Sequence, residues 1–258
     1  IYHEHIGLVE TTIGRMVPVQ TEAMREGDPL RVCAAPYGFF PVDSEAWKGP
    51  KAAIPGLVMA KPFSFYVRRK LFIHNMGHAL CGYLGLYAGH ALVADAIQDS
   101  AIQLIVQNAM LESALALHAG YEQPIAPLCT HIDDLLMRFS NWALGDTCQR
   151  VGADIERKLD KSDRLIGAML YAMDQGITPA FIALGAALAA ARLLEERGEA
   201  ADPDSIADVL LAITGLRRGH AAIQLTLSFV PLILRRAAPD ELLHAARRLC
   251  ADAAGQVV

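Results

Sequence analysis

The stretch that decides the fold is FSFYVRRKLFIHNMGHALCGYLGLYAGH, residues 63–90. It is rich in apolar residues, carries polar ones at scattered positions and contains no proline. Such a run predicts one long helix or two consecutive ones. Amphipathic spacing returns in AIQLIVQNAMLESALALHAG, residues 101–120, and predicts another helix.

The rest of the second half is also helical in character. Asp163 near the start of one predicted helix and Gly198 just after another match the preferences for helix caps. The alanine-rich run ALGAALAAARLL is expected to form a tightly packed helix. The predicted fold class is therefore mainly α, with further helices over residues 130–139, 162–174, 180–197, 205–214 and 239–251.

The composition changes near residue 63. Before that point the chain is rich in proline, and LRVCAAPYGFFPVD, residues 30–43, predicts one or two strands broken at proline. We divide the chain into a β-containing segment, residues 1–63, and an α-helical domain, residues 64–258. No GxGxxG loop follows a strand, so a Rossmann nucleotide-binding domain is absent from these residues.

The overall composition excludes several classes of protein. The chain has 258 residues, 53% of them hydrophobic, which is enough for a core and excludes disorder. A net charge of −5 offers no basic face for nucleic acid. The longest uncharged run, residues 175–191, is too short to span a membrane and predicts a buried helix. Five scattered cysteines without a CxxC pair favour a reducing, cytoplasmic location.

The densest polar cluster in an apolar context contains Lys70, Asn75 and His78. At about 100° per residue the three fall within an arc of about 140° on an α-helix. A desolvated lysine can act as a base near neutral pH, and an amide can stabilise a developing oxyanion. A histidine beside them can orient a hydroxyl. The set suits interconversion of an alcohol and a carbonyl, although a solvated helix face explains the same residues.

The spacing Lys-x4-Asn-x2-His resembles the signature of the polyol-specific long-chain dehydrogenases, which include the mannitol dehydrogenases. KLFIHNMGHALCGYLG, residues 70–85, looks most like the catalytic helix of the mannitol-1-phosphate 5-dehydrogenase branch. The resemblance runs from about Ile6 to Ala190. Its other blocks are LVETTIGRMVP and APYGFFPVD upstream, and MRFSNWALGD, QRVGADIERKL and SDRLI downstream.

The resemblance implies the helical substrate domain of a two-domain, metal-independent, NAD-dependent dehydrogenase that acts on a polyol or polyol phosphate. Lys70 would be the general base, Asn75 would stabilise the alkoxide-like oxygen, and His78 would hold a hydroxyl. Arg150 and Lys158 would hold the far end of the substrate, and both suit a phosphate. NAD would be bound mainly by an N-terminal domain that these residues lack, so this chain alone is expected to be inactive. Oligomeric state stays open.

Two departures from the family pattern put the identity of the substrate in question. Gly14 stands where the family has an aspartate, and Ala35 replaces an acidic residue in the strand block. A mannitol 2-dehydrogenase or aldonate specificity therefore stays open. So does a non-catalytic helical module used for assembly.

A zinc site is a further alternative. His74 and His78 have the i, i+4 spacing of two zinc ligands, with His90 or His118 as a third, but the glutamate of an HExxH motif is missing.

Overall fold

The computed structural model describes residues 2–255 and divides into two compact units. The first unit runs to Lys70 and includes residues 143–145. The second begins at Leu71, contains the rest of the described residues and is almost entirely helical. The mainly α fold class is confirmed. The domain boundary that we place at residue 63 stays a prediction.

The first unit holds two short parallel strands, β1 (Phe40–Asp43) and β2 (Leu57–Ala60), with Phe40 paired to Leu57 and Asp43 to Ala60. Its helices are α1 (Tyr2–His5), α2 (Glu22–Arg25) and α3 (Phe63–Arg68). The prediction of strands over residues 30–43 is right only for the last four residues. Strand β2 was not predicted.

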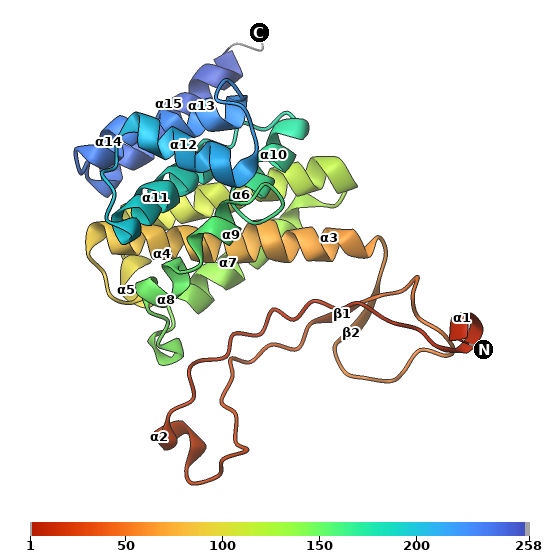
Figure 1. The fold of residues 1–258 in the computed structure, drawn as a ribbon. Helices are drawn as coiled ribbons and strands as arrows, with labels where there is room; N and C mark the ends of the chain where they lie inside the picture. The colour runs from red at the N-terminus through yellow and green to blue at the C-terminus, as the bar shows by residue number, and fades with distance from the viewer. Residues whose placement is uncertain (1, 256–258) are drawn as a thin grey trace. The chain divides into compact units, whose positions relative to one another are not determined.

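Two extended arms on either side of α2 run antiparallel in this unit (Figure 1). The Ala35 N–H donates to Met16 O at 2.9 Å, and the Gln20 side chain bonds both the N–H and the C=O of Cys33. Only one isolated bridge, Thr11 with Val42, joins the arms as a sheet would. The arms therefore lack a regular ladder, which explains why most of the predicted strand is irregular.

Gly14, one of the two departures from the family pattern, lies directly against Tyr37. A Cβ atom built on Gly14 would be 2.9 Å from the Tyr37 hydroxyl oxygen. An aspartate at this position would therefore require the end of the Tyr37 side chain to shift.

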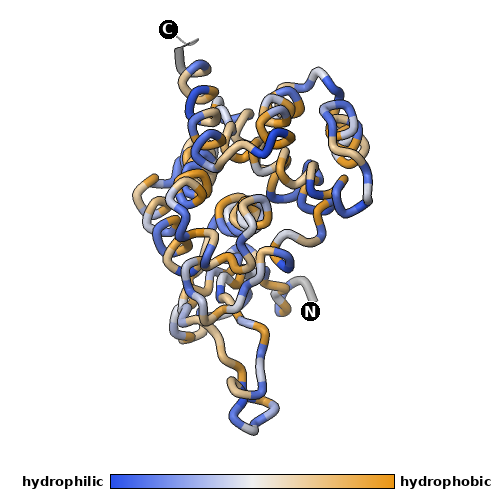
Figure 2. Tube along the Cα trace, turned by 90° about the vertical axis from the view of Figure 1, so that its left-hand side faces the viewer, coloured by the Kyte–Doolittle hydropathy of each residue, from blue (hydrophilic) through white to orange (hydrophobic). Residues whose placement is uncertain are grey.

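The second unit is a set of packed helices (Figure 1). Figure 2 shows polar and apolar residues alternating along them, as expected of helices that bury one face. Its α-helices are α4 (Met76–Ala88), α5 (Val93–Ala96), α6 (Ser100–Tyr121), α7 (Ile125–Phe139), α8 (Cys148–Gly152), α9 (Ile155–Leu159), α10 (Ile166–Asp174), α11 (Ala180–Arg197), α12 (Pro203–Thr214), α13 (Ala221–Leu227), α14 (Val230–Leu234) and α15 (Pro239–Gly255). A π-helical segment, Arg69–Asn75, precedes α4, and a 3₁₀ turn, Trp142–Leu144, follows α7. The division between the two units falls within each of these two segments.

Helix α11 is the centre of the core. It is buried over almost its whole length and packs on α4, α6, α12, α13 and α15. Its run of alanines lets these neighbours approach from several sides, as the sequence predicted, and it ends at Gly198 with φ of 71°. Helix α6 is long and apolar enough to cross a membrane by composition, but 61% of that window is buried inside the fold, as in a core helix.

One predicted helix start is wrong. Asp163 does not cap a helix, because α10 begins only at Ile166. The Asp163 carboxylate instead accepts hydrogen bonds from Arg157 at 2.8 Å and from Arg164 at 2.8 Å. These charged bonds hold the turn that precedes α10.

Candidate functional site

The helix that carries the candidate catalytic residues is not α-helical throughout. Helix α3 passes into a π-helical segment, Arg69–Asn75, which α4 then continues. Hydrogen bonds in a π-helix join residues five apart, so Asn75 lies one turn after Lys70. His78 follows Asn75 by three residues, which is one α-helical turn. The spacing of about 100° per residue expected of an α-helix therefore does not hold between Lys70 and Asn75, and the π turn aligns the three positions better than an α-helix does.

Exposure sets two of these residues apart from their neighbours. Between Phe72 and Gly85 every residue is buried except Asn75 and His78, which are half-buried. Lys70 is half-buried as well. Over these 14 positions only two residues, both polar, are not buried. The stretch is therefore not the solvated face of an amphipathic helix.

The His78 ring is held on one face and at one edge. It stacks on the buried ring of Phe139, with centroids 5.0 Å apart and an interplanar angle of 21°. Its Nε2 lies 3.1 Å from Asp146 Oδ2. The Asp146 side chain, only 10% exposed, also forms an ion pair with Arg150 through Oδ1. Asp146 thus lies between the imidazole and the guanidinium.

Burial, helped by nearby positive charges, keeps the His78 ring neutral. Burial lowers the pKa of His78 to about 3, and the positive charges of Arg150, Lys158 and Arg164 act in the same direction. Both effects disfavour the protonated ring. His78 is therefore an uncharged hydrogen-bonding group at neutral pH.

Lys158 is placed differently from Arg150. Arg150 is exposed, whereas Lys158 is 5% exposed and its Nζ donates to Val151 O at 2.8 Å and to Ala153 O. Burial and the nearby arginines lower the pKa of Lys158 to about 8. Lys158 therefore stabilises the turn between α8 and α9 through these hydrogen bonds. Its positive charge also acts on His78.

Glycines of α4 allow α8 to lie against it. A Cβ on Gly82 would be 2.9 Å from Val151 Cγ1, and a Cβ on Gly85 would collide with Cys148 Sγ. Since α8 carries Arg150 and directly follows Asp146, these two glycines decide how close the charged pair comes to His78.

The zinc alternative has no support in the geometry. His74 is buried, and its ring centroid is 6.4 Å from that of His78 and 6.1 Å from that of Phe139. Among residues 2–255 no group of three histidine, cysteine, aspartate or glutamate side chains could hold a metal ion. His74 is a buried residue beside Phe139.

Sequence reasoning missed two residues of this charge cluster, Asp146 and Arg164. Both lie in blocks that resemble the family, at the end of MRFSNWALGD and within SDRLI. A signal for Asp146 was present, because it precedes Arg150 by four residues, the spacing of a helical ion pair. For Arg164 the sequence carries no comparable signal.

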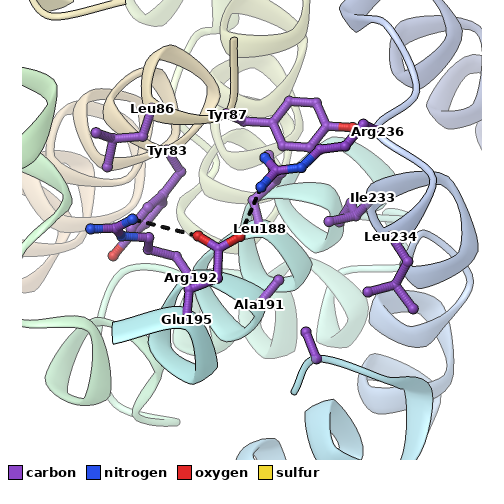
Figure 3. Close-up of a pocket in the computed structure, with 11 residues that line it drawn as sticks. Tyr83, Leu86, Tyr87, Leu188, Ala191, Arg192, Glu195, Ile233, Leu234 and Arg236 are labelled. Carbon is purple, nitrogen blue, oxygen red and sulfur yellow. Dashed lines mark hydrogen bonds and ion pairs between the residues drawn. The ribbon is translucent and has the colours of Figure 1, made fainter. Parts of the chain in front are cut away.

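A separate cavity of about 190 Å³ lies between α4, α11 and α14 (Figure 3). Glu195 bridges its two arginines, at 3.0 Å to Arg236 and 3.4 Å to Arg192. Neither Asn75 nor His78 lines it. The cavity therefore shares no lining residue with the pair Asn75 and His78.

The helical fold agrees with a family of known proteins. Residues 63–229, well over half of the chain, match the family described as mannitol dehydrogenase C-terminal domain. The chain belongs to this family, whose full-length members are polyol dehydrogenases.

Solved structures show the same fold. Mannitol 2-dehydrogenase from Pseudomonas fluorescens, in a ternary complex with NAD and D-mannitol, matches with a TM-score of 0.67 and 19% identity over 93% of this chain and 54% of that one. A D-sorbitol dehydrogenase in substrate-free form matches with a TM-score of 0.66 and 19% identity over 92% and 54%. The chain spans about half the length of these structures.

Proposed function

We propose that the protein carrying this chain is an NAD-dependent oxidoreductase that interconverts a sugar alcohol, or its phosphate, and the corresponding ketone. The observation that carries the proposal is the exposure pattern of the helix. In a stretch that is otherwise buried, only Asn75 and His78 stay accessible, one and two turns beyond Lys70. The family membership and the ternary complex of the mannitol 2-dehydrogenase support it.

Each residue would act on the substrate hydroxyl group. The Lys70 amine would take the hydroxyl proton as the carbon gives up a hydride. The Asn75 amide would donate to the oxygen on which negative charge develops. The neutral His78 ring would bind that hydroxyl or its neighbour. No metal is required in this scheme, because Lys70 and Asn75 together provide the base and the oxyanion contact.

The described residues do not fit the whole of an NAD site. Neither β1 nor β2 is followed by a glycine-rich turn that could present backbone amides to a pyrophosphate. The proposal therefore assigns the polyol to this chain and leaves the dinucleotide to other residues. We expect the protein to act in the cytoplasm.

We further propose a phosphorylated polyol as the preferred substrate, with the free polyol second. Three cations, Arg150, Lys158 and Arg164, are close enough to His78 to lower its pKa. Guanidinium and ammonium groups are the usual partners of a phosphate. The Asp146 carboxylate pairs with Arg150 and the Asp163 carboxylate with Arg164, so the three cations exceed these two carboxylates by one positive charge.

The proposal is tested by NADH formation at 340 nm in the full-length natural protein, with mannitol 1-phosphate and mannitol as substrates. Lys70→Ala is expected to lower kcat at least about a hundredfold, the lower range of a lost general base. Lys51→Ala, at an exposed loop position, is the matched control and should be fully active. Full activity of Lys70→Ala would contradict the proposed role.

An intact mass of the natural protein separates this proposal from the non-catalytic helical module. The chain itself has a mass of 27.9 kDa. A mass heavier by one domain supports the dehydrogenase, whereas a mass near 27.9 kDa together with no turnover of either substrate supports the module.

A further inference from the structure

Asp146 has a rigid backbone position at the start of α8. Its carbonyl accepts a hydrogen bond from Val93 N at 2.9 Å, and Cys148 N donates to Ala91 O at 2.8 Å. An antiparallel bridge between Leu92 and Thr147 lies between these two bonds. Hydrogen bonds thus join the backbone at and just after Asp146 to the loop before α5. They fix the position from which the Asp146 side chain extends.

The Asp146 carboxylate contacts His78 and Arg150 at the same time. One oxygen lies 3.1 Å from His78 Nε2 and the other is paired with Arg150. The Nε2 atom is buried, has no hydrogen bond of good geometry, and approaches no other carboxylate within ion-pair distance in the described residues. Hydrogen bonds of catalytic groups are often poorly aligned before substrate binds and tighten afterwards.

A neutral imidazole has one N–H donor and one acceptor nitrogen, and its neighbours decide which is which. A carboxylate facing Nε2 favours the tautomer with the proton on Nε2, which leaves Nδ1 as the acceptor. The ring face is fixed by Phe139 at a centroid distance of 5.0 Å. The ring then has one orientation and one tautomer. A substrate hydroxyl group therefore always finds Nδ1 as the acceptor, with its lone pair in the same direction.

We propose that Asp146 is a positioning residue of the polyol site, which sets the tautomer of His78 and holds the Arg150 guanidinium beside it. The inference rests on the proposed function, and it adds a residue that neither the family resemblance nor the sequence assigned a role. It links the two binding elements, α4 and α8, through a single carboxylate. The hydroxyl contact and the contact to the far end of the substrate are thereby coupled.

The tautomer of His78 is a direct test that needs no turnover. Two-dimensional ¹H–¹⁵N NMR of the purified wild-type protein, with the His78 signal assigned from His78→Gln, reports which ring nitrogen carries the proton. The Nε2–H tautomer is expected in the wild type, and a mixture is expected in Asp146→Asn. An Nδ1–H tautomer in the wild type, or an unchanged tautomer in Asp146→Asn, would overturn the proposal.

Kinetics provide the second readout. Asp146→Asn is expected to lower kcat/KM about tenfold or more, while Asp146→Glu, which keeps the carboxylate, restores part of it. Asp174→Asn, at an exposed position, is the control for the loss of one negative charge. Equal kcat/KM values for wild type and Asp146→Asn would refute the role. If the wild type oxidises no polyol, the proposed function fails, and the NMR result still decides the role of Asp146.

Discussion

Glu112 Oε1 of α6 accepts a hydrogen bond from the backbone N–H of Phe181 at 3.0 Å, across 69 positions of sequence. Its other carboxylate oxygen accepts from Ile182 N at 3.1 Å. Both N–H groups belong to the first turn of α11, where Pro179 provides no side-chain cap. A carboxyl group from one core helix thus satisfies the start of another, which would otherwise leave donors unpaired in the core.

The Glu112 carboxyl makes the stability of the protein depend on pH. Burial raises its pKa to about 8, although the backbone N–H groups act in the opposite direction. Between pH 4.5, its ordinary pKa, and pH 8 the folded protein holds a proton that the unfolded chain has lost. The free energy of unfolding therefore falls as pH rises through this window, by up to about 1.4 kcal/mol per pH unit from this group.

Urea denaturation of the wild type and Glu112→Gln from pH 5 to 8 measures this contribution. Glutamine does not titrate, so the wild type should lose stability relative to the variant as pH rises. The contributions of all other groups cancel in the difference. A difference that stays constant over the whole range would show that Glu112 does not keep its proton.

The contribution of His78 to the free energy of unfolding changes with pH in the opposite direction. Its pKa is lowered to about 3 in the folded protein, mainly by burial, from an ordinary value of 6.5. The stability that its neutral ring contributes is present above pH 6.5 and is lost as pH falls toward 3. Urea denaturation should show that His78→Gln loses less stability than the wild type between pH 6.5 and 4. Parallel curves for the two proteins would contradict the low pKa.

Replacing Gly85 with alanine tests how α8 is held against α4. The new methyl group would collide with Cys148 Sγ and lie 3.0 Å from Ala96 Cβ. We expect a loss of about 1–3 kcal/mol in the free energy of unfolding, as for other overpacked cores. Gly219→Ala is the control, because a Cβ there meets nothing within 4 Å, and it should stay within about 0.5 kcal/mol of the wild type. Urea denaturation of both variants measures the two effects, and equal stabilities would mean that α8 adapts freely.

Arg150→Gln separates a phosphorylated from a free polyol substrate. Hydrogen bonds to charged groups contribute about 1.5–3 kcal/mol, so kcat/KM for mannitol 1-phosphate should fall about tenfold to a hundredfold. The value for mannitol should fall less, because no phosphate contact is lost. Arg218→Gln, on an arginine whose pair with Asp204 is exposed, is the matched control. An equal loss for both substrates would mean that Arg150 does not bind the phosphate.

Much of the helical body could be predicted, because it depends on local patterns. The apolar spacing of residues 101–120 and the glycine at position 198 correctly predicted a helix and a helix end. The helix starts and short elements were predicted less well. Helices α8, α9, α13 and α14 have only five to seven residues, too few for a periodic signal, and they are stabilised by packing.

The candidate site likewise has features that the sequence predicts and features that it does not. The order and spacing of Lys70, Asn75 and His78 are properties of the sequence, and they indicated a family and a chemistry without any coordinates. The π turn was not predictable, because a local pattern of apolar residues does not distinguish i→i+5 from i→i+4 hydrogen bonds over a single turn.

The sequence by itself determined the helical class, because this depends on composition and periodicity, and its motif blocks resemble one family and thereby indicate which residues are available for chemistry. Only the tertiary structure decided that Asp146 stands between His78 and Arg150 and that Lys158 is buried against backbone carbonyls. These relationships depend on how the helices pack, and the contact between Asp146 and His78 joins positions 68 residues apart. They arise from glycines that let two helices touch and from loops that fix a carboxylate, and no local pattern records them.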